Sequence, residues 1–167
     1  MSLVRPLGPD EWRQLREVRL RALEEAPTDF GSTWAEERDR PDEWWQGSAA
    51  STAWFVAEDD GRIVGLAAGV APGELRPHRE LVSMWVEPAR RGSGLAEELL
   101  ARVVAWARQH GEAELALHVA DGNPRAVRFY ERAGFTRTGR AEPLRSDLSR
   151  CTWEMRKRLD DRDAGVS

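Results

Sequence analysis

The segment from residue 86 to residue 100 constrains the fold most, because a strand, a glycine-bearing loop and an amphipathic helix follow one another without a break. The first turn of a helix leaves backbone N–H groups unpaired and carries the positive end of the helix dipole. Glycine lets an anion approach such groups without a Cβ in the way. We therefore predict an anion site, suited to a pyrophosphate, at Gly92, Ser93, Gly94, Leu95 and Ala96.

The loop alone leaves other interpretations open. The same residues could form an ordinary solvated loop, with Arg90 and Arg91 exposed at its rim and no anion bound. A Walker loop is disfavoured because it needs Lys and then Ser or Thr after its last glycine, where this chain has Leu95 and Ala96. A dinucleotide-binding fold places its glycine loop after the first strand of a parallel βαβ unit, whereas this loop follows an antiparallel-looking hairpin.

Strands and helices alternate along the whole chain. Strands are predicted over residues 2–7, 54–56, 63–68, 81–86, 115–119 and 152–159. Helices are predicted over residues 10–26 and 41–51, from the glycine loop to residue 110, and over residues 123–133, each with Pro or Gly at one or both ends. This order indicates a layered α/β or α+β fold in a single domain over residues 1–159, with residues 160–167 as a flexible tail.

The composition narrows the class of partner. The net charge of -4 and the lack of a basic stripe disfavour a nucleic-acid-binding domain. No unbroken apolar stretch of the N-terminal region suits a signal peptide or a membrane span, so we expect no membrane partner and a cytoplasmic protein. Cys151 is the single cysteine and its neighbours lack metal-ligand spacing, so no metal is expected; a small packed side chain is favoured over a catalytic thiol.

Two motifs resemble the GNAT superfamily of N-acetyltransferases. Arg91-x-x-Gly94-x-Ala96 matches the family's pyrophosphate signature, Gln/Arg-x-x-Gly-x-Gly/Ala, and follows residues 84–88, MWVEP, which are similar to the family's strand ending in Val-x-Pro. Residues 123–135, NPRAVRFYERAGF, match a second and more diagnostic block. Ala96 stands where Gly is commoner and Ser93 where a basic residue is usual.

The resemblance implies a fold and a cosubstrate. It implies a mixed, mostly antiparallel central sheet of about six to seven strands, flanked by about four helices and splayed between the fourth and fifth strands. Acetyl-CoA would lie with its pantetheine arm in that splay, against Met84, Trp85 and Val86, and with its pyrophosphate at residues 91–96. Family habit also suggests a homodimer.

The resemblance further implies the roles of single residues. The N–H of Val86 would polarise the thioester carbonyl, Asn123 would contact the cofactor arm, and Tyr130 would protonate the departing CoA thiolate. Asn123 can also be simply the N-cap of the next helix, and Tyr130, the only tyrosine of the chain, can be a core residue.

Two residues are candidates for the base that deprotonates the attacking amine. Glu80 lies eleven residues before Arg91, as does the base of the histone-acetylating branch, and His118 lies five residues before Asn123, as in ribosomal-protein acetyltransferases. Burial can raise the pKa of a glutamate toward neutrality, and a histidine titrates there unaided. Glu80 is the first choice for the base. The alternative for each residue is a structural role without catalysis, with Glu80 at a solvated strand end and His118 packed or half-exposed on its strand.

The acceptor is expected to enter beside the first two helices. Phe30, Trp34, Trp44 and Trp45 occur there among acidic residues, a combination that suits a cationic amine by cation–π and charge attraction. The acids can equally be a solvated helix surface. We expect N-acetyl transfer to a primary amine of a small molecule or peptide by direct attack; the alternative is a non-catalytic acyl-CoA sensor or assembly module.

Overall fold

A computed structural model describes residues 2–159, and the predicted tail at residues 160–167 lies outside them. The elements in chain order are β1 (Ser2–Pro6), α1 (Trp12–Glu25), α2 (Trp34–Arg38), α3 (Asp42–Ser51), β2 (Ala53–Asp59), β3 (Arg62–Val70), β4 (Arg79–Val86), the 3-10 turn η1 (Pro88–Arg90), α4 (Leu95–Gln109), β5 (Glu114–Ala120), α5 (Pro124–Arg132), β6 (Thr136–Leu144) and β7 (Asp147–Arg158). No helix among the described residues is long and apolar enough to cross a membrane.

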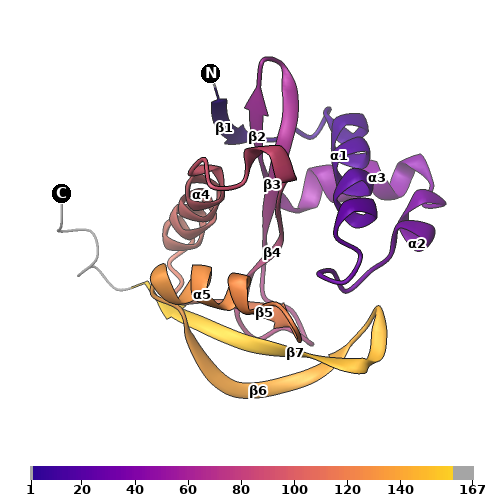
Figure 1. The fold of residues 1–167 in the computed structure, drawn as a ribbon. Helices are drawn as coiled ribbons and strands as arrows, with labels where there is room; N and C mark the ends of the chain where they lie inside the picture. Colours follow the sequence, from indigo (N-terminus) through magenta and orange to yellow (C-terminus); the bar gives the residue numbers. More distant parts are fainter. Residues whose placement is uncertain (1, 160–167) are drawn as a thin grey trace.

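The strands form one mixed sheet in the order β1-β2-β3-β4-β5-β7-β6. Neighbouring strands are antiparallel except β4 and β5, whose parallel pairing is confined to Arg79–Leu115 and Glu80–Ala116. Beyond Glu80 the two strands diverge, and Figure 1 shows β5, β6 and β7 turned away from β1 to β4. The layered fold and the splay between the fourth and fifth strands are therefore confirmed.

Two hydrophobic clusters lie on opposite faces of the sheet. Helices α1 and α3 cover one face, with Leu15, Leu23 and Trp45 fully buried against β2 and β3, whereas α4 and α5 cover the other. The α4 layer also contacts the sheet closely at Gly69, where an added Cβ would lie 2.4 Å from the Trp106 ring. Alternating strand residues thus belong to different cores, which fixes the register of the sheet.

Two elements lie outside the predicted set. Strand β6 was not predicted, because all its residues except Leu144 are exposed and it therefore lacks apolar alternation. Strand β7, which pairs with β6, also begins earlier than predicted, at Asp147 instead of residue 152. Helix α2 is a single five-residue segment whose N-cap, Thr33, accepts a hydrogen bond from the N–H of Glu36.

Candidate functional site

The gap between β4 and β5 opens beside a bulge in β4. In the β3–β4 register Leu66 pairs with Trp85 and Ala68 with Val82, so Ala67 alone faces the two residues Ser83 and Met84. The bulge lies three residues beyond Glu80, where pairing with β5 stops. An extended molecule can therefore meet unpaired β4 backbone from the bulge onward.

The last residue of β4 presents its backbone to this gap. The N–H of Glu87 donates to the Val64 carbonyl of β3 at 2.8 Å. Because successive residues of a strand direct their N–H groups to opposite edges, the N–H and C=O of Val86 point away from β3. The Val86 carbonyl accepts a hydrogen bond from Arg91 Nε at 3.1 Å, which leaves its N–H directed into the gap.

The loop after η1 presents the start of α4 to solvent. Gly92 and Gly94 have φ of 80° and 90°, and a Cβ built on either would meet no heavy atom within 4 Å. The first backbone bond of α4 is from Glu98 N–H to the Gly94 carbonyl, so the earlier amides have no helical partner. Leu95 is buried in the core and anchors the helix start, and the Ser93 hydroxyl donates to the Arg90 carbonyl. This open cradle of amides fits a pyrophosphate group.

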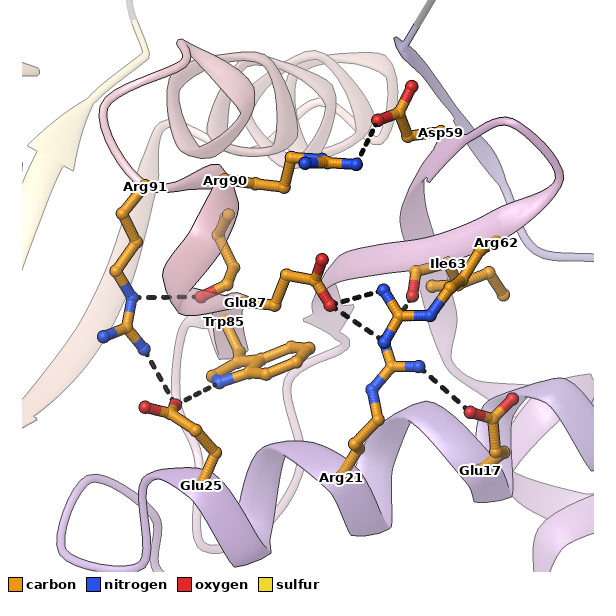
Figure 2. Close-up of polar contacts among 11 residues, drawn as sticks. Glu17, Arg21, Glu25, Asp59, Arg62, Ile63, Trp85, Glu87, Arg90 and Arg91 are labelled. Atoms are coloured by element: carbon orange, nitrogen blue, oxygen red, sulfur yellow. Dashed lines mark hydrogen bonds and ion pairs between the residues drawn. The ribbon is translucent and has the colours of Figure 1, made fainter.

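Both arginines of the loop bind carboxylates of the protein (Figure 2). Arg90 lies 2.7 Å from Asp59, and Arg91 Nη2 donates to Glu25 Oε2 at 2.8 Å. The same Glu25 oxygen accepts from Trp85 Nε1 at 2.8 Å. The arginines therefore brace the loop against β2 and α1, and the backbone amides are the open donors of the cradle.

Glu87 ties the end of β4 to the rest of the sheet and to α1. Its Oε2 atom lies 2.7 Å from Arg62 Nη1 of β3 and 3.8 Å from Arg21 Nη2 of α1 (Figure 2). Arg21 also binds Glu17 at 3.0 Å and donates to the Ile63 carbonyl. The residue that follows Val86 is thus fixed by charged contacts from two elements.

Asn123 and Tyr130 lie at the other side of the gap, on α5. Asn123 is the N-cap of that helix, since its Oδ1 accepts from Ala126 N–H at 3.2 Å, and its amide lies 3.4 Å from Asp29. Tyr130 is buried, with its ring edge-on to Phe129 and Phe135. Burial raises the pKa of its phenol well above the ordinary value, so the hydroxyl stays protonated in the pH range of enzymes.

The two base candidates meet where β4 and β5 still pair. Glu80 Oε2 lies 3.8 Å from His118 Nδ1 and 3.2 Å from Arg76 Nε, and Glu80 is buried. Burial raises the pKa of Glu80, while the nearby His118 and Arg76 oppose that shift. On its other side His118 Nε2 lies 3.0 Å from Glu142 Oε1. Sequence reasoning missed Glu142, because it belongs to the unpredicted strand β6.

Both candidates line a groove of about 1360 Å³ beside α1, α2 and the end of β6. Phe30, Trp44 and Trp45 contribute to its wall, but Trp45 is 1% exposed and belongs mainly to the core. Trp34 is not among the residues that line this groove. The exposed rings already stack with arginines, Trp34 with Arg38 and Trp44 with Arg40, at 4.8 and 5.1 Å to the ring centroids. No group of three or more metal-ligating side chains occurs among residues 2–159.

Some known proteins are similar to this chain in sequence, and others are similar to it in fold. Mycothiol acetyltransferase from Thermobispora bispora is 33% identical over 134 residues, which make up 78% of this chain and 44% of that protein. A structure of yncA from Salmonella typhimurium with its cofactor acetyl-CoA has a TM-score of 0.74 at 20% identity, covering 96% of this chain and 95% of that one. Ribosomal-protein-alanine N-acetyltransferase from Brucella melitensis has a TM-score of 0.72 at 23% identity, covering 93% and 99%.

The match to a known family covers the segment that carries the cradle and the gap. The chain spans less than half the length of the mycothiol acetyltransferases that it matches, 44% and 38% for two of them. The sequence profile of the acetyltransferase (GNAT) family matches residues 18–135, which contain the C-terminal part of α1, the β4 bulge, the glycine loop and α5. This chain therefore belongs to the acetyltransferase (GNAT) family.

Proposed function

We propose that the protein transfers the acetyl group of acetyl-CoA to an amine by direct attack. The observation that carries the proposal is the position of the Glu80–His118 pair, which lies at the closed end of the β4–β5 gap and also lines the groove. An amine in the groove and a thioester in the gap would meet beside a group able to accept a proton.

The described residues suit the cosubstrate. The amides of residues 92–96 would hold the pyrophosphate, while the β4 backbone from Met84 to Val86 would pair with the pantetheine arm. Asn123, the cap of α5, would contact that arm, and its amide also lies near Asp29. Acetyl-CoA supplies an activated acyl group when bound; the protein supplies orientation and proton transfer.

Three groups would divide the chemical work. Glu80, or His118 beside it, would accept the proton that the attacking amine loses. The N–H of Val86 would donate to the thioester oxygen as charge develops there. Tyr130 would donate its proton to the sulfur as the carbon–sulfur bond breaks. The amine ends as an amide, the thiolate leaves as a thiol, and the Tyr130 phenolate regains a proton before the next cycle.

The charges of the groove favour a cationic acceptor. Its lining contains six carboxylates, at positions 29, 36, 37, 74, 80 and 142, and four arginines, at positions 19, 40, 76 and 145. Arg19 and Arg76 are bound to Glu37 and Glu80. Carboxylates therefore outnumber arginines among the remaining groups, which attracts an ammonium substrate. We propose a primary amine of a small molecule or peptide.

A panel of amines with acetyl-CoA tests this function. Release of CoA and mass gain of the acceptor should appear together for at least one cationic amine and depend on enzyme concentration. Binding of acetyl-CoA without acetyl transfer to any acceptor would instead favour a sensor or assembly module of the same fold.

A further inference from the structure

The β4 bulge contains a residue with unusual backbone geometry. Ser83 has a φ of 61°, and within residues 2–159 the one other non-glycine residue with positive φ is Asp60, in the turn between β2 and β3. A left-handed residue inside a strand is costly for any side chain except glycine, and it persists only where its surroundings hold it.

A half-buried arginine from another element holds this residue. Arg19 of α1 donates from Nη1 to Ser83 Oγ at 2.9 Å. Its Nε and Nη2 donate to the two oxygens of Glu37 in α2 at 3.0 and 2.9 Å, and Glu37 is 3% exposed. The guanidinium also lies 4.9 Å from the centroid of the Phe30 ring.

This arrangement leaves the arginine little freedom. A carboxylate bound through two parallel hydrogen bonds fixes the plane of the guanidinium, so the remaining nitrogen has one direction in which to donate. That direction leads to the Ser83 hydroxyl. A buried charged pair is a weak source of stability because both groups lose their hydration, which makes a positioning role the better account of it.

We propose that Arg19, held by Glu37, is a positioning residue that fixes the β4 bulge through Ser83 and so directs the N–H of Val86 into the gap. If Ser83 relaxed to an ordinary extended conformation, the bulge would be lost and β4 would shift by one residue against β3. A shift of one residue turns every following backbone group to the opposite edge, and the N–H of Val86 would then face β3. This inference rests on the proposed acyl transfer.

Substitutions at Ser83 separate the backbone from the hydroxyl. Ser83→Ala and Ser83→Gly both remove the hydroxyl, but only glycine adopts a φ of 61° without strain. We expect single-turnover acetyl transfer to fall at least about tenfold in Ser83→Ala and to be largely retained in Ser83→Gly. Calorimetry should show weaker acetyl-CoA binding in Ser83→Ala than in Ser83→Gly, because the pyrophosphate cradle is unchanged in both but the β4 backbone no longer faces the pantetheine arm in Ser83→Ala. Equal transfer rates in Ser83→Ala and the wild type would overturn the proposal.

Substitution of the arginine tests the same contact from its other end. Arg19→Met should slow transfer about as much as Ser83→Ala, and the two changes combined should cost little more than either alone. The matched control is Arg5→Met, which removes an arginine bound to Glu11 and Glu58 at 2.8 and 2.9 Å, away from the gap. That control should lower the melting temperature and leave the rate of transfer unchanged. Equal rate losses in both arginine variants would show a general effect of destabilisation and overturn the proposal.

Hydrogen exchange keeps this inference separate from the proposed function. The amides of residues 83–86 should exchange faster in Arg19→Met than in Arg5→Met, whether or not an acceptor has been found. Unchanged exchange at these amides in Arg19→Met would overturn the positioning role even in an active acetyltransferase. Failure of the wild type to acetylate any amine would refute the proposed function and leave the exchange result to decide the role of Arg19 in holding the bulge.

Discussion

The ring of Tyr130 packs between Phe129 and Phe135, so its position does not depend on its hydroxyl. We therefore expect Tyr130→Phe to keep the fold and the affinity for acetyl-CoA while turnover falls about a hundredfold or more, as for loss of a general acid. Single-turnover measurement follows the chemical step even where product release limits kcat. Equal single-turnover rates for Tyr130→Phe and the wild type would leave Tyr130 as a core residue.

Glu80 sits beside His118, and a base substitution must distinguish the two. Glu80→Gln should slow transfer at neutral pH by about a hundredfold, with recovery as pH rises and the acceptor amine loses its own proton. His118→Gln is the matched comparison at the neighbouring position. If neither variant alters the pH–rate profile, the base is an ordered water or another group.

The raised pKa of Glu80 also predicts an effect on stability. A carboxyl group with a higher pKa in the folded than in the unfolded protein favours folding when protonated, and this advantage is lost as pH rises through the folded pKa. At pH values above the ordinary glutamate value the raised pKa of Glu80 therefore costs stability, and Glu80→Gln should melt at a higher temperature than the wild type. The difference should disappear below the ordinary glutamate value of 4.5, where both side chains are neutral. A lower melting temperature for Glu80→Gln at neutral pH would contradict the prediction.

At the scale of elements, the glycine loop and the start of α4 form the site that the sequence defines best. Gly94→Trp should abolish acetyl-CoA binding, because the indole would occupy the open space beside the amides. Gly139→Trp is the control, since Gly139 has a similar positive φ of 84° and open space but lies in the β6 strand. Both variants place a tryptophan at a positive φ, so a loss of affinity in Gly94→Trp alone cannot come from backbone strain. Unchanged affinity by calorimetry in a folded Gly94→Trp protein would refute the cradle.

The elements show what local patterns can and cannot predict. Helical spacing predicted α4, which buries one face, and two apolar runs on either side of the turn at residues 59–61 predicted the β2–β3 hairpin, which is buried on both faces. Strand β6 buries neither face except at Leu144, and its place beside β7 depends on tertiary pairing. The contacts of Arg91 and Arg19 with residues 66 and 64 positions away likewise have no local signal. Sequence therefore indicated the cradle and the candidate bases, but not the carboxylates that hold the arginines.

At the scale of the whole molecule, the groove has a surplus of negative charge that salt should screen. For a cationic acceptor, we expect KM to rise several-fold from low ionic strength to about 0.5 M salt, with little change for a neutral-tailed amine. The double variant Glu36→Gln, Glu74→Gln, which neutralises two lining residues, should raise KM for the cationic acceptor at low salt. Glu131→Gln, on the exposed face of α5, is the control. A KM that is independent of both salt and groove charge would contradict a cationic acceptor.

The order of the strands also governs when the protein can become active during its synthesis. Strand β5 pairs with β4 at two positions only, whereas it pairs with β7 along its whole length from Glu114 to Ala120. Because β5 ends at Ala120 and its main partner begins only at Asp147, β5 leaves the ribosome before that partner does. Until that strand emerges, His118 has no completed sheet around it and Glu142 cannot reach it. A nascent chain could form the acetyl-CoA cradle early and yet acquire a competent acceptor site only when β7 leaves the exit tunnel.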